Sequence, residues 1–327
     1  MRTAPWLAAA LVLLPMALAA PAIHVTTTWD TLAPVPVART EVAAAQALGK
    51  VYVMGGFTGN GAGSARVDVY ETVTNAWSLG PSLPYPMHHT QAVALGSRIL
   101  VIGGYPSQLP GFTPHALVWM LDTALPLQAQ AWVPFPPLPE ARGAHAAATD
   151  GCAVYVAGGT GPQQNQLATQ AYMLPCVGGV TIPAWVRIAD FPDPRDHLAG
   201  AVLGGKFYVV GGRDLTLTTN TGRMDVYDPA ANAWSQGPSM PTARGGIAGA
   251  IAGGLVWVFG GEHASGATFC QAEGYSPTAN AWVSGTPMPT CRHGLGAAAL
   301  GDAIYVEAGG PIAGLTVTDK NERLRVQ

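Results

Sequence analysis

A tryptophan recurs about every fifty residues along this chain, and each one sets the register of a longer pattern. The six tryptophans are Trp29, Trp77, Trp132, Trp185, Trp234 and Trp282. A proline follows each of them by seven residues, at Pro36, Pro84, Pro139, Pro192, Pro241 and Pro289. Ten residues after the tryptophan, five repeats carry an arginine and the second carries Met87. The arginines are Arg39, Arg142, Arg195, Arg244 and Arg292. Such a chain is expected to fold as six copies of one structural unit.

A pair of glycines marks the second half of each repeat, twenty-six residues after the tryptophan. The pairs begin at Gly55, Gly103, Gly158, Gly211 and Gly260, and Ala308-Gly309 takes this place in the sixth repeat. Short aromatic and β-branched runs such as Val154-Tyr155-Val156 precede the pairs and indicate buried strands. No stretch shows a helical period of useful length, so the sequence predicts an all-β protein.

These features together resemble the kelch repeat. The resemblance rests on the period, on the glycine pair after an apolar strand, and on a Tyr-to-Trp interval of seven residues at Tyr70/Trp77, Tyr227/Trp234 and Tyr275/Trp282. It implies a six-bladed β-propeller over residues 25–320, built from four-stranded antiparallel blades around a central axis.

The two ends of the pattern predict how the ring closes. Val25 to Trp29 matches the last strand of a blade, and the third strand of the sixth repeat is expected near Leu315 to Val317. The N-terminal strand would then complete the C-terminal blade and hold the ring shut through backbone hydrogen bonds. Residues 321–327 are expected to form a C-terminal tail.

The first twenty residues have the form of a signal peptide. Arg2 precedes an apolar stretch from Trp6 to Leu18, and Ala17-Leu18-Ala19 has the small-x-small form of a cleavage site. This stretch is too short and too interrupted, by Pro15, to span a bilayer. We expect a secreted protein, extracellular or periplasmic, with no membrane span after cleavage.

Charge and motifs exclude several classes of function. A formal net charge of −3 without any Lys or Arg run argues against nucleic acid as a partner. The sequence contains no nucleophile elbow, no phosphate-binding loop and no His-Glu-x-x-His, and no two histidines stand at a strong metal-ligand spacing. We expect a monomer without cofactor or metal.

Four cysteines allow three disulfide pairings, and the repeat selects one of them. Cys152 starts a diglycine strand and Cys176 ends the next strand of the same blade. The loops that follow the diglycines lie on one face, which we call the funnel face, and both of these cysteines lie on the opposite face. Cys270 opens the third strand of the fifth blade, and Cys291 lies beside Arg292 on the funnel face. Bridges Cys152–Cys176 and Cys270–Cys291 are therefore expected.

Up-down counting of strands places two sets of loops on the funnel face. The loops that enter the innermost strands bring the repeat arginines, and the positions after the diglycines bring Phe57, Tyr105, Arg213 and Glu262. Arginines offer forked donors to carboxylates and sugar hydroxyls, and aromatic rings stack on sugars. The candidate ligand-binding residues are Arg39, Arg142, Arg195, Arg213, Arg244, Arg292, His293, Phe57 and Tyr105.

The arginines of the repeat have an alternative role, which is to hydrogen-bond carbonyls and carboxylates between blades. Glu307 is the most unusual residue, because the other repeats carry Met54, Ile102, Ala157, Val210 and Phe259 at its place in a buried strand. It is expected to pair with an arginine, Arg292 being the first choice, or to reach the channel as a functional acid. Glu41 and His197 are expected to point into the channel.

Three functions follow as hypotheses. The first is an exported binding module that takes a glycan or a protein segment in the funnel. The second is a sugar-active enzyme, because the layout is similar to that of the six-bladed sialic acid mutarotases, in which a catalytic glutamate follows a diglycine as Glu262 does here. That family places an arginine six residues later, where this chain has Thr268. A copper enzyme similar to galactose oxidase is the third, but it needs seven blades and a tyrosine-histidine copper site that the sequence does not supply.

Overall fold

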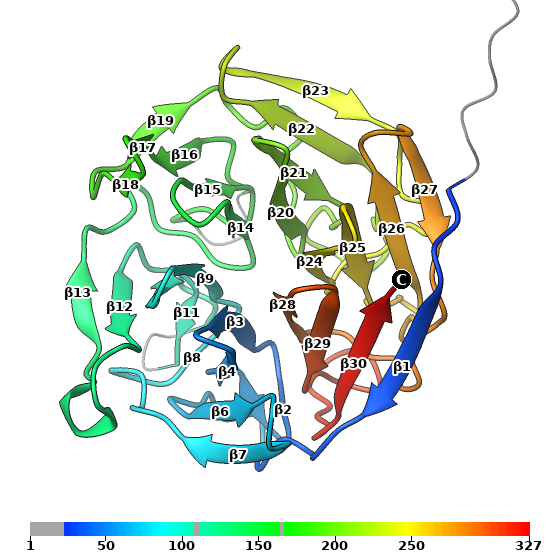
Figure 1. Ribbon diagram of the computed structural model, residues 1–327. Helices are drawn as coiled ribbons and strands as arrows, with labels where there is room; N and C mark the ends of the chain where they lie inside the picture. The colour runs from blue at the N-terminus through cyan, green and yellow to red at the C-terminus, as the bar shows by residue number, and fades with distance from the viewer. Residues whose placement is uncertain (1–22, 108–110, 164–166) are drawn as a thin grey trace, which may run out of the picture.

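Six four-stranded antiparallel sheets surround a central axis in the computed structural model, which describes residues 23–107, 111–163 and 167–327 (Figure 1). The sheets confirm the predicted six-bladed propeller. The predicted signal peptide, residues 1–20, lies outside the described residues. Within the described ranges no helix is long and apolar enough to cross a membrane, and the short 3-10 helix η1 (Leu127–Ala129) lies in a turn of the second blade.

Each of the first five blades runs outward from the axis in chain order. Blade 1 contains β3 (Ala43–Ala47), β4 (Lys50–Met54), β6 (Val67–Glu71) and β7 (Ala76–Leu79). Blade 2 contains β9 (Gln91–Leu95), β10 (Arg98–Ile102), β12 (Val118–Asp122) and β13 (Val133–Phe135). Blade 3 contains β14 (Ala146–Thr149), β15 (Val154–Ala157), β16 (Ala171–Leu174) and β19 (Val186–Ile188). Blade 4 contains β20 (Ala199–Leu203), β21 (Lys206–Val210), β22 (Met224–Asp228) and β23 (Ala233–Gly237). Blade 5 contains β24 (Ala248–Ala252), β25 (Leu255–Phe259), β26 (Ala272–Ser276) and β27 (Ala281–Ser284).

The sixth blade joins the two ends of the chain. It contains β28 (Gly296–Leu300), β29 (Ala303–Glu307), β30 (Asn321–Val326) and, outermost, β1 (Thr27–Thr31). β1 pairs antiparallel with β30 along its whole length, and the two strands lie side by side at the rim in Figure 1. The predicted closure by the N-terminal strand is therefore confirmed.

The third strand of this blade is not where the sequence placed it. Residues 315–317 lie in the loop that precedes it, and the strand is β30 at residues 321–326. Residues 321–327 therefore belong to the propeller instead of forming a tail. Their alternation explains the difference: Leu324 and Val326 are buried in the core between blades 5 and 6, whereas the charged residues between them resemble an exposed segment in the sequence.

The tryptophans and diglycines of the repeat hold neighbouring blades together. Each of the six indole N–H groups donates a hydrogen bond of 2.8–2.9 Å to a backbone carbonyl outside its own blade sheet, as Trp77 does to Ala33. The first glycine of each diglycine lies against the backbone carbonyl of the next repeat's arginine-register residue. A Cβ at Gly103 would lie less than 3.0 Å from the carbonyl oxygen of Arg142, which explains the preference for glycine at this place.

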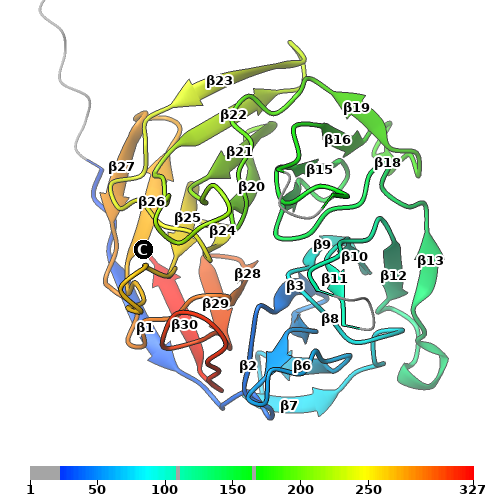
Figure 2. The same cartoon turned by 180° about the vertical axis from the view of Figure 1, so that it is seen from behind.

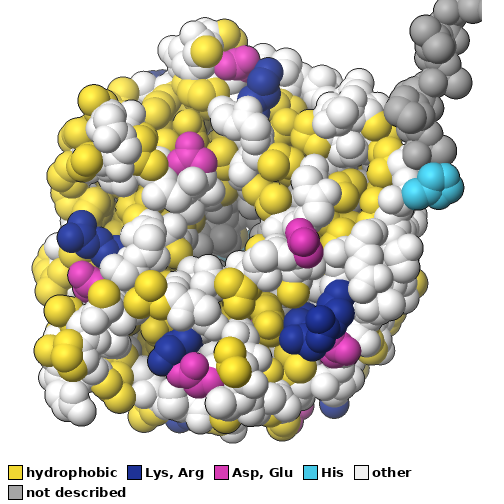
Figure 3. All heavy atoms as spheres, viewed as in Figure 1, with side chains coloured by type: hydrophobic (Ala, Val, Ile, Leu, Met, Phe, Trp, Pro, Cys, Tyr) yellow, Lys and Arg dark blue, Asp and Glu magenta, His cyan; other side chains and the backbone are white. Residues whose placement is uncertain are grey.

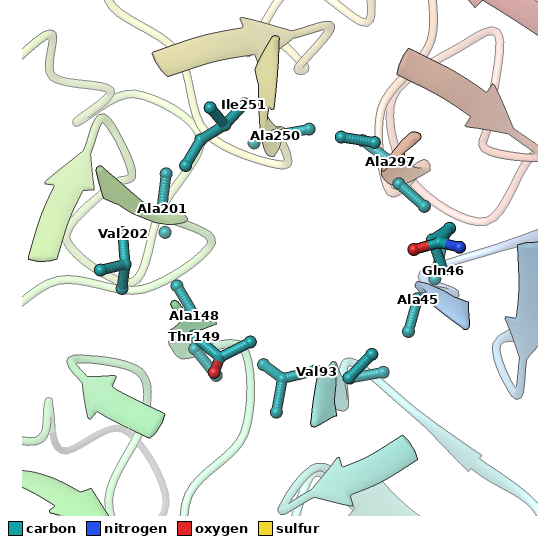
Figure 4. A pocket seen from close by; sticks show the side chains of 18 of the residues that line it. Ala45, Gln46, Val93, Ala148, Thr149, Ala201, Val202, Ala250, Ile251 and Ala297 are labelled. Carbon is teal, nitrogen blue, oxygen red and sulfur yellow. The ribbon is translucent and has the colours of Figure 1, made fainter. Parts of the chain in front are cut away.

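The channel along the axis has two unlike ends. At the end seen in Figures 1 and 3 it is wide, with a cavity of about 320 Å³ lined largely by small apolar side chains of the innermost strands (Figure 4). Positively and negatively charged side chains adjoin one another at several places on the face shown in Figure 3. Surface ion pairs of the blades include Lys50–Glu71 and Lys206–Asp228. The other end, turned toward the viewer in Figure 2, is the funnel face, and the two-stranded pairs β2 (Arg39–Thr40) with β5 (Phe57–Thr58) and β8 (Met87–His88) with β11 (Tyr105–Pro106) lie there.

Candidate functional site

The five repeat arginines were predicted to line the funnel, but they lie inside the blades. Their exposed fractions are 0–2 %. In blade 1, Arg39 Nη1 donates to the carbonyls of Gly55 and Arg66 at 2.9 Å, and Nη2 donates to Asp68 at 2.6 Å. Burial lowers the pKa of Arg39 to about 10, so the guanidinium remains charged at neutral pH. The repeat arginines therefore hydrogen-bond carbonyls and carboxylates, which is the alternative role that the sequence suggested. Their contacts lie within one blade, however, and not between blades.

An acidic partner meets the arginine in four of the blades, always at the second residue of the third strand. The pairs are Arg39–Asp68, Arg195–Asp225, Arg244–Glu273 and Arg292–Glu322. In blade 3 the same strand position is Tyr172, and the Arg142 guanidinium lies 5.1 Å from the centroid of its ring. In blade 2, where Met87 replaces the arginine, the position is Trp119. An acidic residue at this strand position thus occurs only in blades that carry the arginine, although blade 3 keeps the arginine without it.

Glu307 is fully buried between blades and does not pair with Arg292. Neither of its carboxylate oxygens has a hydrogen-bond partner among the residues described, while Arg292 Nη2 donates to Glu322 at 2.7 Å. Burial raises the pKa of Glu307 to about 8, an effect that the charge of Arg292 partly opposes. The predicted ion pair is therefore wrong, and Glu307 is a buried carboxylic acid that is mostly protonated at neutral pH.

Both predicted disulfides are present. Cys152–Cys176 joins the turn between β14 and β15 to the short strand that follows β16. Cys270–Cys291 joins the β25–β26 loop of blade 5 to the loop between blades 5 and 6 at the funnel face. The hairpin β17 (Cys176–Val177) with β18 (Val180–Thr181) extends the first bridge beyond the blade. Two persistent disulfides are typical of proteins that fold in an oxidising compartment.

The floor of the funnel is a ring of six residues, one from each blade, twelve residues after each tryptophan. We call it the constriction ring: Glu41, His89, Ala144, His197, Gly246 and Gly294. All six have positive φ, between 45° and 75°. Their backbones form a closed circle of hydrogen bonds, in which His89 N donates to Glu41 O at 3.1 Å and Gly294 N donates to Gly246 O at 2.9 Å; Val42 N closes it on Gly294 O at 3.3 Å. Because that geometry costs a side chain about 1 kcal/mol or more, three non-alanine side chains in this ring are unusual.

A second ring covers the first. It consists of the residues that follow the diglycines, and we call it the upper ring: Phe57, Tyr105, Thr160, Arg213, Glu262 and Gly310. Each pairs antiparallel with the residue just before the constriction ring of its own repeat, as His88 does with Tyr105 and Asp196 with Arg213. One half of the funnel is thereby aromatic and the other half is charged.

The charged half is a connected network. Arg213 Nη1 donates to Glu262 Oε1 at 2.5 Å, its Nη2 lies 2.9 Å from His197 Nε2, and its Nε lies 3.4 Å from Asp196. Gly314 N donates to the second oxygen of Glu262 at 3.1 Å, and His293 Nε2 lies 3.5 Å from it. The predicted catalytic Glu262 and ligand residues Arg213 and His293 are thus brought together, and Glu262 ties blades 4, 5 and 6 to one another. Its use as a catalytic base stays a prediction.

The aromatic half is packed and not open to stacking by a sugar. Phe57 and Tyr105 are both buried; Phe57 stacks on His88 with ring centroids 3.9 Å apart, and Tyr105 shares a hydrogen bond with Thr160. Burial raises the pKa of Tyr105 to about 12. Phe112, which the sequence did not single out, packs edge-on against Tyr105 at 5.3 Å and remains 54 % exposed. Among the described aromatic side chains of this half, Phe112 is therefore the exposed one.

Glu41, His89 and His197 occupy one register of the repeat, and two of them were already singled out from the sequence. Glu41 and His197 point to the channel as expected, and His89 joins them, since it occupies the same register. Glu41 Oε2 lies 3.3 Å from His89 Nε2, and burial together with nearby positive groups holds the pKa of His89 well below its usual value. The cavity that these residues line measures about 40 Å³, which is space for about two or three water molecules but not for a monosaccharide.

Comparisons with known proteins agree with this architecture. A model of the KLHDC2/KLHL20/DRC7 Kelch-repeats domain matches residues 88–310, and a Kelch motif model matches residues 38–84. Kelch-like protein 36 of Mus musculus is 26 % identical over 190 residues, which are 56 % of this chain and 29 % of that protein. Kelch-like protein terF of Aspergillus terreus is 28 % identical over 170 residues, 50 % of this chain and 34 % of the relative. Kelch-like protein 25 of Xenopus tropicalis is 25 % identical over 221 residues, 63 % and 34 % of the two chains. The chain spans about a third of the length of these relatives.

Proposed function

Because the chain belongs to the kelch-repeat family, we propose that it is an exported binding module whose funnel face recognises a protein ligand. The observation that carries the proposal is a set of exposed apolar side chains on the loops of this face. Phe112 of blade 2 is 54 % exposed, and Ile312 and Leu315 of blade 6 are each 57 % exposed. Leu215 of blade 4 adds a further, smaller apolar surface.

The arrangement of these side chains supports a protein over a glycan. Phe112 rests on the buried aromatic half of the funnel, and Leu315 lies near Gly61 of blade 1 across the join of the ring. A protein segment lying across the funnel could bury apolar side chains against both, as partners do at interface centres. Glycan binding as predicted needs accessible arginines and stacking rings, but the five repeat arginines and the rings of Phe57 and Tyr105 are buried.

A peptide-display selection on the untagged protein tests the binding site. We expect enriched peptides to contain apolar residues and to bind at least tenfold more weakly to Phe112→Ala and to Ile312→Asp. Val177→Asp is the matched control, because Val177 is 63 % exposed on the opposite face. Equal loss with Val177→Asp would place the binding site elsewhere. Selective glycan binding that depends on Phe112, without any peptide binding, would contradict the protein reading.

Export is supported by the signal-like first twenty residues and by the two disulfides. N-terminal sequencing of protein made from the full gene in a secreting host is the test. We expect the mature chain to begin after Ala19 or Ala20. An intact Met1 on protein retained with reduced cysteines would contradict export.

A further inference from the structure

The geometry of the constriction ring points to a site for one divalent transition-metal ion of the zinc class, held by Glu41, His89 and His197. Their three ligand atoms lie within 4.8 Å of one another, the one such group among the described residues. The sequence predicted no metal because no two histidines have a ligand spacing. The ligands instead come from blades 1, 2 and 4, at one register of the repeat, and only closure of the ring brings them together.

Two of the ligand atoms already have the separation that a metal would impose. Glu41 Oε2 and His89 Nε2 are 3.3 Å apart. In a tetrahedral zinc site with bonds of about 2.0–2.1 Å, adjacent ligand atoms are about 3.3–3.4 Å apart. A carboxylate with two imidazoles is also a recurrent zinc ligand set, which leaves the fourth position for water.

The hydrogen bonds of His197 determine which of its two nitrogens can bind a metal. Its Nδ1 lies 2.7 Å from Asp196 Oδ1, and a carboxylate oxygen accepts a hydrogen bond. Its Nε2 lies 2.9 Å from Arg213 Nη2, and because a guanidinium can only donate, Nε2 must be the acceptor. The tautomer is therefore fixed with the proton on Nδ1, and the Asp196–His197 pair has the form of the carboxylate–histidine pairs that orient metal ligands.

His89 is oriented in a similar way. Its Nδ1 lies 2.7 Å from Nδ1 of His88, which is itself stacked on Phe57 and cannot turn away. Without a metal, His89 Nε2–H can donate to Glu41 while Nδ1 accepts from His88. A shift of the proton to Nδ1, where His88 accepts it, frees the Nε2 electron pair for a metal ion. Both imidazoles thus have a partner on Nδ1, and the ligand atoms of His89, His197 and Glu41 lie within 4.8 Å of one another.

The charges at the funnel floor favour a cation. The floor holds three carboxylates, those of Glu41, Asp196 and Glu262, and one guanidinium, that of Arg213. Arg213 pairs with Asp196 and Glu262, whereas Glu41 lies against His89 and His293. The adjoining cavity of about 40 Å³ leaves space for water ligands. Metal binding requires Arg213 to release His197 Nε2, and the guanidinium would then keep Glu262 and Asp196 as partners.

The test is a titration of the mature, untagged protein with Zn²⁺ by calorimetry and with Co²⁺ by visible absorption. We expect one ion per chain and a tetrahedral Co²⁺ spectrum. Glu41→Gln, His89→Gln and His197→Gln should each weaken Zn²⁺ binding by at least tenfold. Asp196→Asn should weaken it by roughly tenfold, since lost outer partners of ligands typically cost 10–100-fold.

Controls separate a specific site from adventitious binding. His263→Gln is the matched variant, because His263 is an exposed histidine of the same face that contacts Ser265 instead of the network. It should bind Zn²⁺ as the parent does, and so should Phe112→Ala, which separates this site from the proposed protein-binding surface. Near-UV circular dichroism in the absence of metal checks that each variant folds. No stoichiometric binding by the parent, or unchanged binding by a folded His89→Gln/His197→Gln double variant, would overturn the proposal.

Discussion

Arg292 Nη2 and Glu322 Oε2 lie 2.7 Å apart inside the sixth blade, and neither side chain is more than 2 % exposed. The guanidinium also donates to the carbonyls of Ala308 and Lys320, so one buried cation connects the diglycine strand, the loop after it and the last strand of the chain. Thr290 donates to the other oxygen of Glu322. The pair therefore fixes β30, the strand that receives β1 and closes the ring.

Glu322→Ala should destabilise the protein by about 3–5 kcal/mol, because it leaves the Arg292 charge buried without a carboxylate. The measurement is the free energy of unfolding from urea titration. Glu71→Ala is the control, since Glu71 pairs with Lys50 at the surface and its loss should cost about 1 kcal/mol or less. Similar costs for the two variants would show that the buried pair contributes no more than a surface pair.

Glu307 should make the protein less stable as the pH rises. Its pKa is near the ordinary 4.5 in the unfolded chain and about 8 in the folded protein, so between these values the folded state binds more protons. Stability must then fall from about pH 4.5 to about pH 8 and carry the full penalty above it, by a few kcal/mol at about 1.4 kcal/mol per pKa unit.

Glu307→Met tests this dependence, because another repeat carries Met54 at the same place. The variant should be more stable than the parent at pH 8.5, and the difference should shrink toward pH 5. Unfolding temperatures measured across this range give the answer. A difference that does not vary with pH would mean that Glu307 is not titrating in the folded protein.

The recurrent residues predicted the fold well because their roles are set by the blade itself. A tryptophan that reaches a neighbouring connection, and a glycine that faces a carbonyl, repeat with the blade and so can be read from spacing. The cysteine pairs followed from the same spacing. The direction of a side chain does not follow from it, however. Arg39 and its equivalents begin on the funnel face but turn back into their blades, where four of the five meet a carboxylate supplied nearly thirty residues later.

The last strand and the funnel floor were harder to predict for other physical reasons. In β30 the charged Glu322 is neutralised by Arg292, so a buried strand has the composition of an exposed segment. Glu41, His89 and His197 share a register, but they come from blades 1, 2 and 4, and the curvature of the ring must form before that register becomes a cluster. The spacing of residues in the sequence predicts the single blade, whereas the contacts between side chains of different blades form only when the blades assemble into the ring.

Loss of Trp29 from β1, the strand that closes the ring, should reduce hydrogen-exchange protection more than loss of the equivalent tryptophan from another blade. Trp29 of β1 donates to Thr286 at 2.8 Å and packs edge-on against Phe259. Trp29→Ala should lose hydrogen-exchange protection in both β1 and β30, because β1 is attached to its blade by one ladder and not by a turn. Trp77→Ala is the control, since Trp77 lies in a strand joined to its neighbour by a short turn. Equal losses of protection in the two variants would show that the strand ladder alone holds the ring closed.

The two disulfides should have similar effects on stability and different effects on binding. Their cysteines are 24 and 21 residues apart in sequence, so loop closure predicts about 3 kcal/mol for each. The double variants Cys152→Ala/Cys176→Ala and Cys270→Ala/Cys291→Ala should therefore lose comparable free energies of unfolding. Only the second should weaken peptide binding at the funnel face, because Cys291 adjoins Arg292 and the Cys270 bridge holds the loop that carries Glu262. Loss of binding in the first variant alone would move the ligand site to the opposite face, where the Cys152 bridge lies.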